Sequence, residues 1–174
     1  MKSIIIITDN KIKKLYGLNL LARLKAAGLS AGLLFFPAGE KSKTLPTVIR
    51  LQEQMFKLGC ERDTLVIALG GGVVGDVAGF VASIYMRGLS YIQIPTTLLA
   101  MIDSSIGGKT GVNNKFGKNL LGSFYQPEAV LLETGFLDTL SVKHSRNGLF
   151  EAAKIFLIRD KTMWKWFVRN LDKI

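Results

Sequence analysis

The residues with the clearest chemical potential are three glycines near the middle of the chain. Gly70, Gly72 and Gly75 fit the pattern G-x-G-x-x-G between a predicted strand over 64–69 and a predicted apolar helix. In that position, backbone N–H groups and the helix dipole can hold a pyrophosphate. The alternative is that the glycines serve only a tight turn and close helix packing. Asp76 begins the apolar helix, where a carboxylate either complements the dipole or faces a ligand.

This pattern departs from the usual dinucleotide fingerprint in two ways. It lies in the third predicted strand–helix unit instead of the first, and no acidic residue lies about 20 positions downstream to hold a ribose. The glycines alone therefore indicate a nucleotide site but do not identify it.

A second group of polar side chains lies in the segment 103–123, whose Gly, Ser and Asn content predicts a long functional loop. Gly108-Lys109-Thr110 resembles the end of a phosphate-binding P-loop, but Asp103 stands where that motif requires glycine, which disfavours an NTPase. The combination suits anionic oxygens and hydroxyls, and the alternative is a solvated loop. Its members are Asp103, Lys109, Asn113, Lys118 and Asn119.

The lone histidine and the lone cysteine do not form a metal site by themselves. His144 is interpreted as an exposed or helix-start residue, and Cys60 as a buried or idle thiol far from it in the sequence. With one cysteine, no internal disulfide is possible, so the chain suits a reducing cytoplasm.

The elements that must position these residues alternate between strands and helices. Apolar runs predict strands over 4–7, 31–36, 64–69 and 91–94, and helical spacing predicts helices over 11–27, 45–58 and from the glycines to about residue 86. This alternation predicts an α/β fold, a Rossmann-like parallel sheet with helices on both faces. Ligand sites should lie at the carboxyl ends of the strands, which are residues 8–9, 37–43, 70–76 and 95–103.

Length and charge narrow the functional classes. The chain has 174 residues and 48% hydrophobic residues, enough for one ordinary globular domain. Its net charge of +10 is divided into +7 over residues 1–50, −2 over 51–142 and +5 over 143–174. The Gly-rich middle is therefore slightly acidic, and nucleic-acid binding is disfavoured. The longest apolar region, 65–85, is interrupted by Gly70, Gly71, Gly72 and Gly75 and by Asp76, so we expect no membrane span.

Several sequence blocks, taken in order, resemble 3-dehydroquinate synthase over roughly residues 4–158. They are GGGVVGDVAGF at 70–80, YMRG at 85–88, IPTTLLA at 94–100, DSSIGGKTGVN at 103–113 and GKNL at 117–120. The resemblance implies an NAD-binding α/β domain followed by a largely helical domain, with the active site between them. It also implies transient oxidation of a substrate hydroxyl by NAD, phosphate elimination, re-reduction and ring closure. The implied substrate is a phosphorylated seven-carbon sugar acid, converted to 3-dehydroquinate in the shikimate pathway.

The resemblance also implies roles for particular residues around the cofactor. Asp9, Glu40 and Lys43 match contacts on the adenosine side, with Glu40 in the ribose role that the missing downstream acid would otherwise fill. The cofactor-contacting residues implied in this way are Asp9, Glu40, Lys43, Gly71, Gly72, Val73, Asp76, Thr96, Thr97, Phe136 and Thr139.

On the substrate side, the resemblance implies that Asp103, Lys109, Lys118, Asn119 and Lys154 contact the substrate. Arg87 matches an arginine that reaches the phosphate site of the partner subunit in a homodimer. Glu151 matches a ligand of the divalent metal, zinc or cobalt. Three residues depart from the family pattern, because Phe150 replaces a small residue while Ser141 and His144 stand where Pro and Glu are common. We therefore expect altered local geometry there.

The chain ends before the family segment that carries two metal-binding histidines. We therefore expect a NAD domain over 1–140 and the first helices of a truncated helical domain over 141–174, with no cyclase activity and no retained zinc in this chain alone. One competing hypothesis is a non-catalytic nucleotide-binding or interaction module, a decayed remnant whose exposed face meets another protein. The other is a related sugar-phosphate cyclase or a metal-dependent polyol dehydrogenase. Large apolar residues near the C-terminus lead us to expect self-association. They are Phe156, Leu157, Trp164, Phe167 and Leu171.

Overall fold

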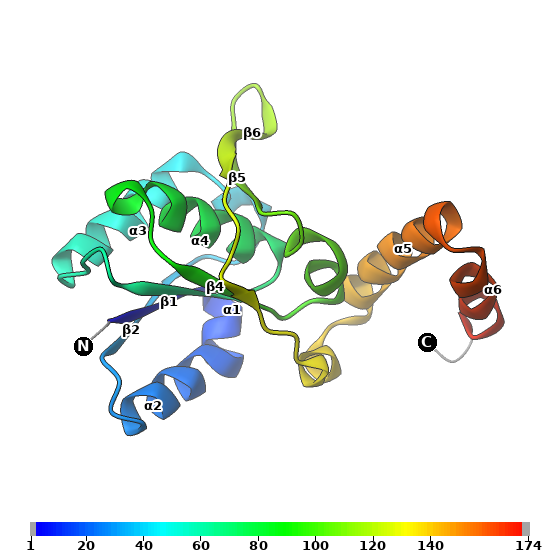
Figure 1. Ribbon diagram of the computed structural model, residues 1–174, viewed down its shortest axis with the longest axis horizontal. Coiled ribbons are helices and arrows are strands. Elements are labelled where there is room, and N and C mark those ends of the chain that lie inside the picture. The colour runs from blue at the N-terminus through cyan, green and yellow to red at the C-terminus, as the bar shows by residue number, and fades with distance from the viewer. Residues whose placement is uncertain (1–2, 172–174) are drawn as a thin grey trace.

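The computed structural model describes residues 3–171 and contains a five-stranded sheet flanked by helices (Figure 1). All paired strands in this sheet are parallel, and their order is β2-β1-β3-β4-β7. The predicted α/β architecture is therefore confirmed. The strands are β1 Ile4–Asp9, β2 Ala31–Phe36, β3 Leu65–Gly70, β4 Tyr91–Pro95 and β7 Ala129–Val130.

The connections between these strands are helical, as parallel pairing requires. The first connection begins as α1, passes through a π-helical turn, η1, and continues as α2, and the later connections contain α3 and α4. Their bounds are α1 Asn10–Ile12, η1 Lys13–Gly17, α2 Leu18–Ala26, α3 Leu45–Lys57 and α4 Gly72–Ile84, with short 3₁₀ turns η2 Glu40–Ser42 and η3 Tyr85–Arg87. These bounds agree with the predicted helices to within a few residues.

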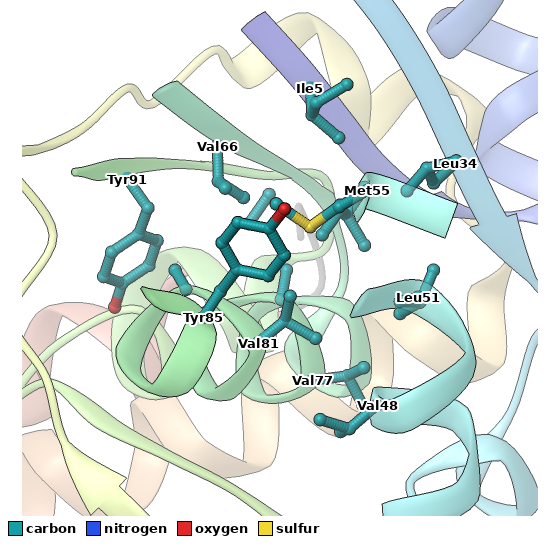
Figure 2. Packing of buried hydrophobic residues seen from close by; sticks show 14 of the residues in the cluster. Ile5, Leu34, Val48, Leu51, Met55, Val66, Val77, Val81, Tyr85 and Tyr91 are labelled. Carbon is teal, nitrogen blue, oxygen red and sulfur yellow. The ribbon is translucent and has the colours of Figure 1, made fainter. Parts of the chain in front are cut away.

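Helices cover both faces of the sheet, because the central strands are apolar on both sides. On one face, Val48 and Leu51 of α3 and Val77 of α4 belong to one buried cluster with sheet residues such as Ile5 and Val66 (Figure 2). On the other face, α2 packs against a second cluster built from alternate residues of the same strands. The sheet is therefore buried on both faces. Because its strands are parallel, their carboxyl ends lie at one edge of the sheet.

The segment 103–123 is not the long loop that its composition predicts. A π-helical turn, η4 Ala100–Ser104, is followed by an antiparallel hairpin of β5 Lys109–Asn114 and β6 Gly117–Phe124, and β5 packs on α4. Gly111 and Gly122 face each other, and a Cβ atom on either would meet a backbone carbonyl oxygen of the opposite strand. The glycines that suggested a loop are therefore required for close approach of two strands.

The C-terminal part consists of the 3₁₀ turn η5 Thr134–Thr139 and two helices, α5 Val142–Arg159 and α6 Lys161–Arg169. Figure 1 shows α5 and α6 extending away from the sheet. Phe167 is buried, with its ring centroid 5.8 Å from that of Phe156 and 6.2 Å from that of Trp164. Of the five apolar residues from which self-association is expected, these three therefore contact one another where α6 folds back on α5, whereas Leu157 and Leu171 are exposed. Within residues 3–171, no helix combines the length and the apolar composition that crossing a membrane requires.

Candidate functional site

The main candidate site is a cavity of about 640 Å³ at the carboxyl edge of the parallel sheet. The turns after β1, β2, β3 and β4 all contribute to its wall. Because β2 and β3 lie on opposite sides of β1, the strand order reverses there, which is where open α/β sheets bind ligands. Of the expected cofactor residues, only Phe136 does not line the cavity. The residues that do line it are Asp9, Glu40, Lys43, Gly71, Gly72, Val73, Asp76, Thr96, Thr97 and Thr139.

The glycine turn forms the floor of this cavity. Gly71 has an extended backbone and precedes α4, and no side chain caps the first turn of that helix. A Cβ atom on Gly71 would lie 3.1 Å from Cγ2 of Thr97, and one on Gly72 would lie 2.9 Å from Oγ of Ser104. The glycines therefore allow close packing, which confirms that part of the interpretation, and no side chain occupies the N–H groups at the start of α4, so the pyrophosphate role of the motif stays a prediction.

Asp9 has a structural role of its own in the cavity wall. One carboxylate oxygen accepts hydrogen bonds from the N–H groups of Lys11 and Ile12, at 2.8 and 2.9 Å, and so caps α1. The cap fixes the direction in which the chain leaves β1. The second oxygen of the same carboxylate is available to a ligand.

A buried ion pair crosses the inner wall of the cavity. The Lys43 Nζ atom lies 2.5 Å from Asp76 Oδ2, and it also donates to the side-chain oxygen of Asn119. The Lys43 side chain is 6% exposed and that of Asp76 is 19% exposed. Lys43, expected on the adenosine side, thus directs its ammonium group toward Asp76 and the hairpin.

The Asp76 carboxyl group is in an unfavourable environment for a charge. Burial raises its pKa, and the negative charges of Glu40 and Asp103 raise it further, whereas the ammonium group of Lys43 lowers it. A carboxyl pKa that is shifted by both burial and specific charged neighbours is typical of functional sites.

A second cavity, of about 440 Å³, lies beside the first, between η4 and the hairpin. Three expected substrate residues, Asp103, Lys109 and Asn119, line it. Asp76 and Ser104 line both cavities, so the two spaces meet at these side chains. The arrangement can hold an extended ligand and an anionic one in contact with each other.

Two hydroxyl groups in these walls have no protein partner. The Oγ1 atom of Thr96 and the Oγ atom of Ser104 are buried and make no hydrogen bond within residues 3–171. Because a buried hydroxyl without a partner is costly, these groups are suited to bind polar atoms of a ligand.

Five of the expected site residues lie outside both cavities, and three of them are Phe136, Lys118 and Arg87. Phe136 packs edge-on against Tyr16, with ring centroids 4.7 Å apart, and the Tyr16 hydroxyl is bonded to Thr139, so Phe136 supports the wall from behind. Lys118 is exposed on the hairpin. Arg87 is exposed at the far end of α4, at the opposite edge of the sheet.

Glu151 and Lys154 lie on α5 and line neither cavity. They form an ion pair with each other, and this hydrogen bond raises the pKa of Lys154. Phe150 is 75% exposed, so most of its ring faces solvent. Across residues 3–171, no cluster of three or more His, Cys, Asp or Glu side chains is arranged to hold a metal ion.

Several residues of the cavity wall were not singled out by the sequence as ligand contacts. Ser104 follows Asp103 in the sequence block 103–113. Its position beside an expected substrate residue was the only sequence signal that marked it. His144 is exposed in the first turn of α5, as predicted, but it also lines the larger cavity. Other such residues are Lys11, Tyr16, Ser141 and Asn147.

Comparison with known proteins gives a consistent result. The profile described as 3-dehydroquinate synthase N-terminal matches residues 33–147. The 3-dehydroquinate synthase of Acidithiobacillus ferrooxidans is 46% identical over 169 residues, which are 97% of this chain and 46% of that protein. The chain therefore spans about half the length of this relative.

Solved structures are also similar. The structure of ValA, a 2-epi-5-epi-valiolone synthase from Streptomyces hygroscopicus subsp. jinggangensis with NAD⁺ and Zn²⁺ bound, has a TM-score of 0.91 and 37% identity, covering 98% of this chain and 48% of that one. A 2-deoxy-scyllo-inosose synthase in complex with carbaglucose-6-phosphate, NAD⁺ and Co²⁺ has a TM-score of 0.84 and 36% identity, covering 90% and 42%. With the profile matching well over half of its residues, this chain belongs to the 3-dehydroquinate synthase N-terminal family.

Proposed function

We propose that this chain is the NAD-binding portion of a 3-dehydroquinate synthase. The reaction would convert 3-deoxy-D-arabino-heptulosonate 7-phosphate to 3-dehydroquinate and phosphate. The observation that carries the proposal is the junction at Asp76 and Ser104, where the cavity behind the glycine turn meets the cavity that contains Lys109. A dinucleotide in the first cavity would thus contact a phosphorylated sugar acid in the second.

The larger cavity has the donors and acceptors that NAD requires. The open N–H groups at the start of α4 would bind the pyrophosphate. The Glu40 carboxylate, which follows β2, would accept hydrogen bonds from the adenosine ribose and repel a 2′-phosphate. The unpartnered hydroxyl of Thr96 would bind a further polar atom of the cofactor. When bound, NAD supplies a transient hydride acceptor for one substrate hydroxyl.

The smaller cavity supports binding of an anion with hydroxyl groups. The Lys109 ammonium group is exposed to it and would pair with a carboxylate or phosphate of the substrate. Asp103 and Asn119 would orient neighbouring hydroxyls, and Lys118, on the same hairpin, would add positive charge at the rim. Asp76 would remain paired with Lys43 at the junction, which keeps that carboxylate in a fixed position.

We propose Glu151 as one ligand of a divalent metal, zinc or cobalt, and Lys154 as a substrate contact. A catalytic zinc site needs about three protein ligands. The described residues do not supply such a set, so they do not fit a complete metal centre. No chemical step is therefore assigned to a metal here.

We propose that the chain divides into two structural parts, a cofactor domain over 1–140 and residues from 141 onward that belong to a helical domain. The position of Arg87, exposed and remote from both cavities, supports a homodimer in which this arginine serves the partner's phosphate site. We also propose a cytoplasmic location, which suits a chain whose single cysteine, Cys60, is a free thiol.

The cofactor assignment is tested by calorimetric titration of the chain with NAD and with NADP. NAD should bind, NADP should bind more weakly, and E40A should reduce NAD affinity about tenfold or more, because a charge-assisted pair of hydrogen bonds is lost. The exposed residue Glu128, which lies outside the cavity, provides the control variant E128A. Absence of NAD binding would favour the non-catalytic remnant, and equal affinities for the two cofactors would remove the ribose role of Glu40.

A related sugar-phosphate cyclase is the second candidate, because the solved structures with TM-scores of 0.91 and 0.84 are of such enzymes. The two candidates differ in whether the ligand carries a carboxylate. In the presence of NAD, 3-deoxy-D-arabino-heptulosonate 7-phosphate should raise the unfolding temperature more than glucose 6-phosphate does, and K109A should remove this difference. A larger effect of glucose 6-phosphate would favour the second candidate.

A further inference from the structure

Asn113 is the residue where the hairpin is joined to the segment that follows β2. It lies in β5 at an irregularity in the pairing with β6, between Val112 and Asn114. Its backbone N–H donates to the carbonyl oxygen of Lys43 at 2.9 Å, and it forms an isolated parallel bridge with Thr44. The backbone position of Asn113 is therefore fixed relative to Lys43.

The side chain of Asn113 uses both ends of its amide. Its Nδ2 atom donates to Glu40 Oε1 at 2.7 Å, and its Oδ1 atom accepts from the backbone N–H of Asn119 at 2.9 Å. Asn119 has a left-handed backbone with φ of 57°, a conformation that is uncommon for residues other than glycine and that Asn adopts more readily than most. One amide therefore orients the Glu40 carboxylate and also stabilises the turned backbone of Asn119.

This amide completes a chain of polar contacts between the two cavities. Glu40 lines only the larger cavity and Asn119 only the smaller one, while Asn119 accepts from Lys43, which is paired with Asp76. Asn113 lines neither cavity, so its route to a ligand in either of them is through the two residues that its side chain contacts, Glu40 and Asn119.

We propose that Asn113 is a positioning residue that sets the Glu40 carboxylate for the nucleotide ribose and thereby determines the preference for NAD over NADP. The same amide holds Asn119 in place at the neighbouring cavity. This inference rests on the proposed function, because it takes NAD as the ligand of the larger cavity.

Two substitutions separate the two hydrogen bonds. N113D keeps an oxygen for the Asn119 N–H but places a carboxylate against Glu40, so it removes the donor and turns Glu40 away. N113A removes both contacts. We expect N113D to weaken NAD binding about ten- to a hundred-fold, the range for loss of a hydrogen bond to a charged group, and to lower the ratio of NAD to NADP affinity. Amide hydrogen exchange at Asn119 should become faster in N113A and stay unchanged in N113D.

Asn114 offers a matched control in the same hairpin. Its Oδ1 atom accepts from the N–H groups of Phe116 and Gly117, at 2.9 and 3.1 Å, and it makes no contact with Glu40. N114A should loosen the turn but leave NAD affinity within about twofold. If N114A changed the ratio of NAD to NADP affinity as much as N113D does, general hairpin stability would explain the effect and the inference would be wrong.

A swapped pair tests the contact even if N113D is poorly folded. In E40Q/N113D, the new amide at position 40 can donate to the new carboxylate at position 113, so the urea midpoint should recover relative to N113D. Wild-type protein that binds NAD, together with an N113D variant of equal affinity and selectivity, would overturn this inference alone. Wild-type protein that binds neither cofactor would overturn the proposed function and this inference with it.

Discussion

Replacing Lys43 with methionine should destabilise the fold strongly at neutral pH. Methionine has nearly the length of the lysine side chain but no charge, so K43M leaves the Asp76 carboxylate without its cation. In the structure, the two groups are 2.5 Å apart and their side chains are 6% and 19% exposed. Removal of one partner of a buried pair costs ~3–5 kcal/mol. Because Asp76 keeps some contact with water, we expect about 3 kcal/mol, a large part of the ~5–15 kcal/mol that stabilises a typical domain.

The cost of K43M should depend on pH with a defined sign. The pKa of Asp76 is raised by burial and by Glu40 and Asp103, and Lys43 opposes this increase, so K43M must raise the pKa further. A carboxyl group whose pKa is higher in the folded state contributes stability below its unfolded pKa of about 3.9, and this contribution disappears as pH rises through the folded value. K43M should therefore be close to the wild-type stability near pH 4 and fall below it as pH increases.

Urea unfolding at pH 4.0 and pH 7.5 measures this difference as a change in the free energy of unfolding. The double variant K43M/D76N removes both charges, and we expect it to recover most of the stability lost at pH 7.5, because a neutral pair of similar volume is often tolerated in place of a buried ion pair. Two results would refute the reasoning. One is an equal loss for K43M at both pH values, and the other is a double variant that is as unstable as K43M.

Three further predictions concern the packing around the sheet. In G79A, the new Cβ atom would lie 2.5 Å from Cγ2 of Thr110, so the hairpin must shift away from α4. Urea unfolding should show a loss of about 1–3 kcal/mol in the free energy of unfolding. A loss below about 0.5 kcal/mol would show that the contact yields easily. In Y85F, loss of the buried hydroxyl that donates to the Cys60 carbonyl at 2.9 Å should cost about 1–2 kcal/mol, and an unchanged urea midpoint would contradict this. Burial raises the pKa of the Cys60 thiol, so a disulfide reagent should label it only as fast as the protein unfolds, and immediate labelling of native protein would be incompatible with its buried position.

The sheet and its helices were predictable from the sequence because their signals are local. The isoleucine run at 4–7, the apolar stretch at 65–69 and the helical spacing over 45–58 each report burial through the residue types themselves. The hairpin was not predictable in this way. All but two residues of β6 are exposed, so no alternation of apolar and polar residues marks it. Gly111 and Gly122 indicate a loop to any local rule, although they are needed for strand contact.

The residues of the candidate site also differ in whether a local sequence pattern could identify them. The glycine turn could be identified from spacing alone, since its pyrophosphate contacts would be backbone groups within one short segment. The proposed ribose acceptor could not, because Glu40 follows β2 and reaches the cavity only through the order of the strands. The resemblance to a known family supplied that residue, and the position of Glu40 in the cavity wall supports the proposal that it replaces an acid downstream of the glycines.

Lys43 shows why the function of a polar residue depends on contacts that no local pattern contains. The sequence placed it with Glu40 on the adenosine side, three residues away along the chain. In the fold, its ammonium group reaches Asp76 on α4 and Asn119 on the hairpin, which are 33 and 76 positions away. Both partners line the smaller cavity, whereas Lys43 itself lines the larger one. Lys43 therefore connects the walls of the two cavities. A change in its charge should therefore alter both cavities together, which a lysine that contacted only the adenosine could not do.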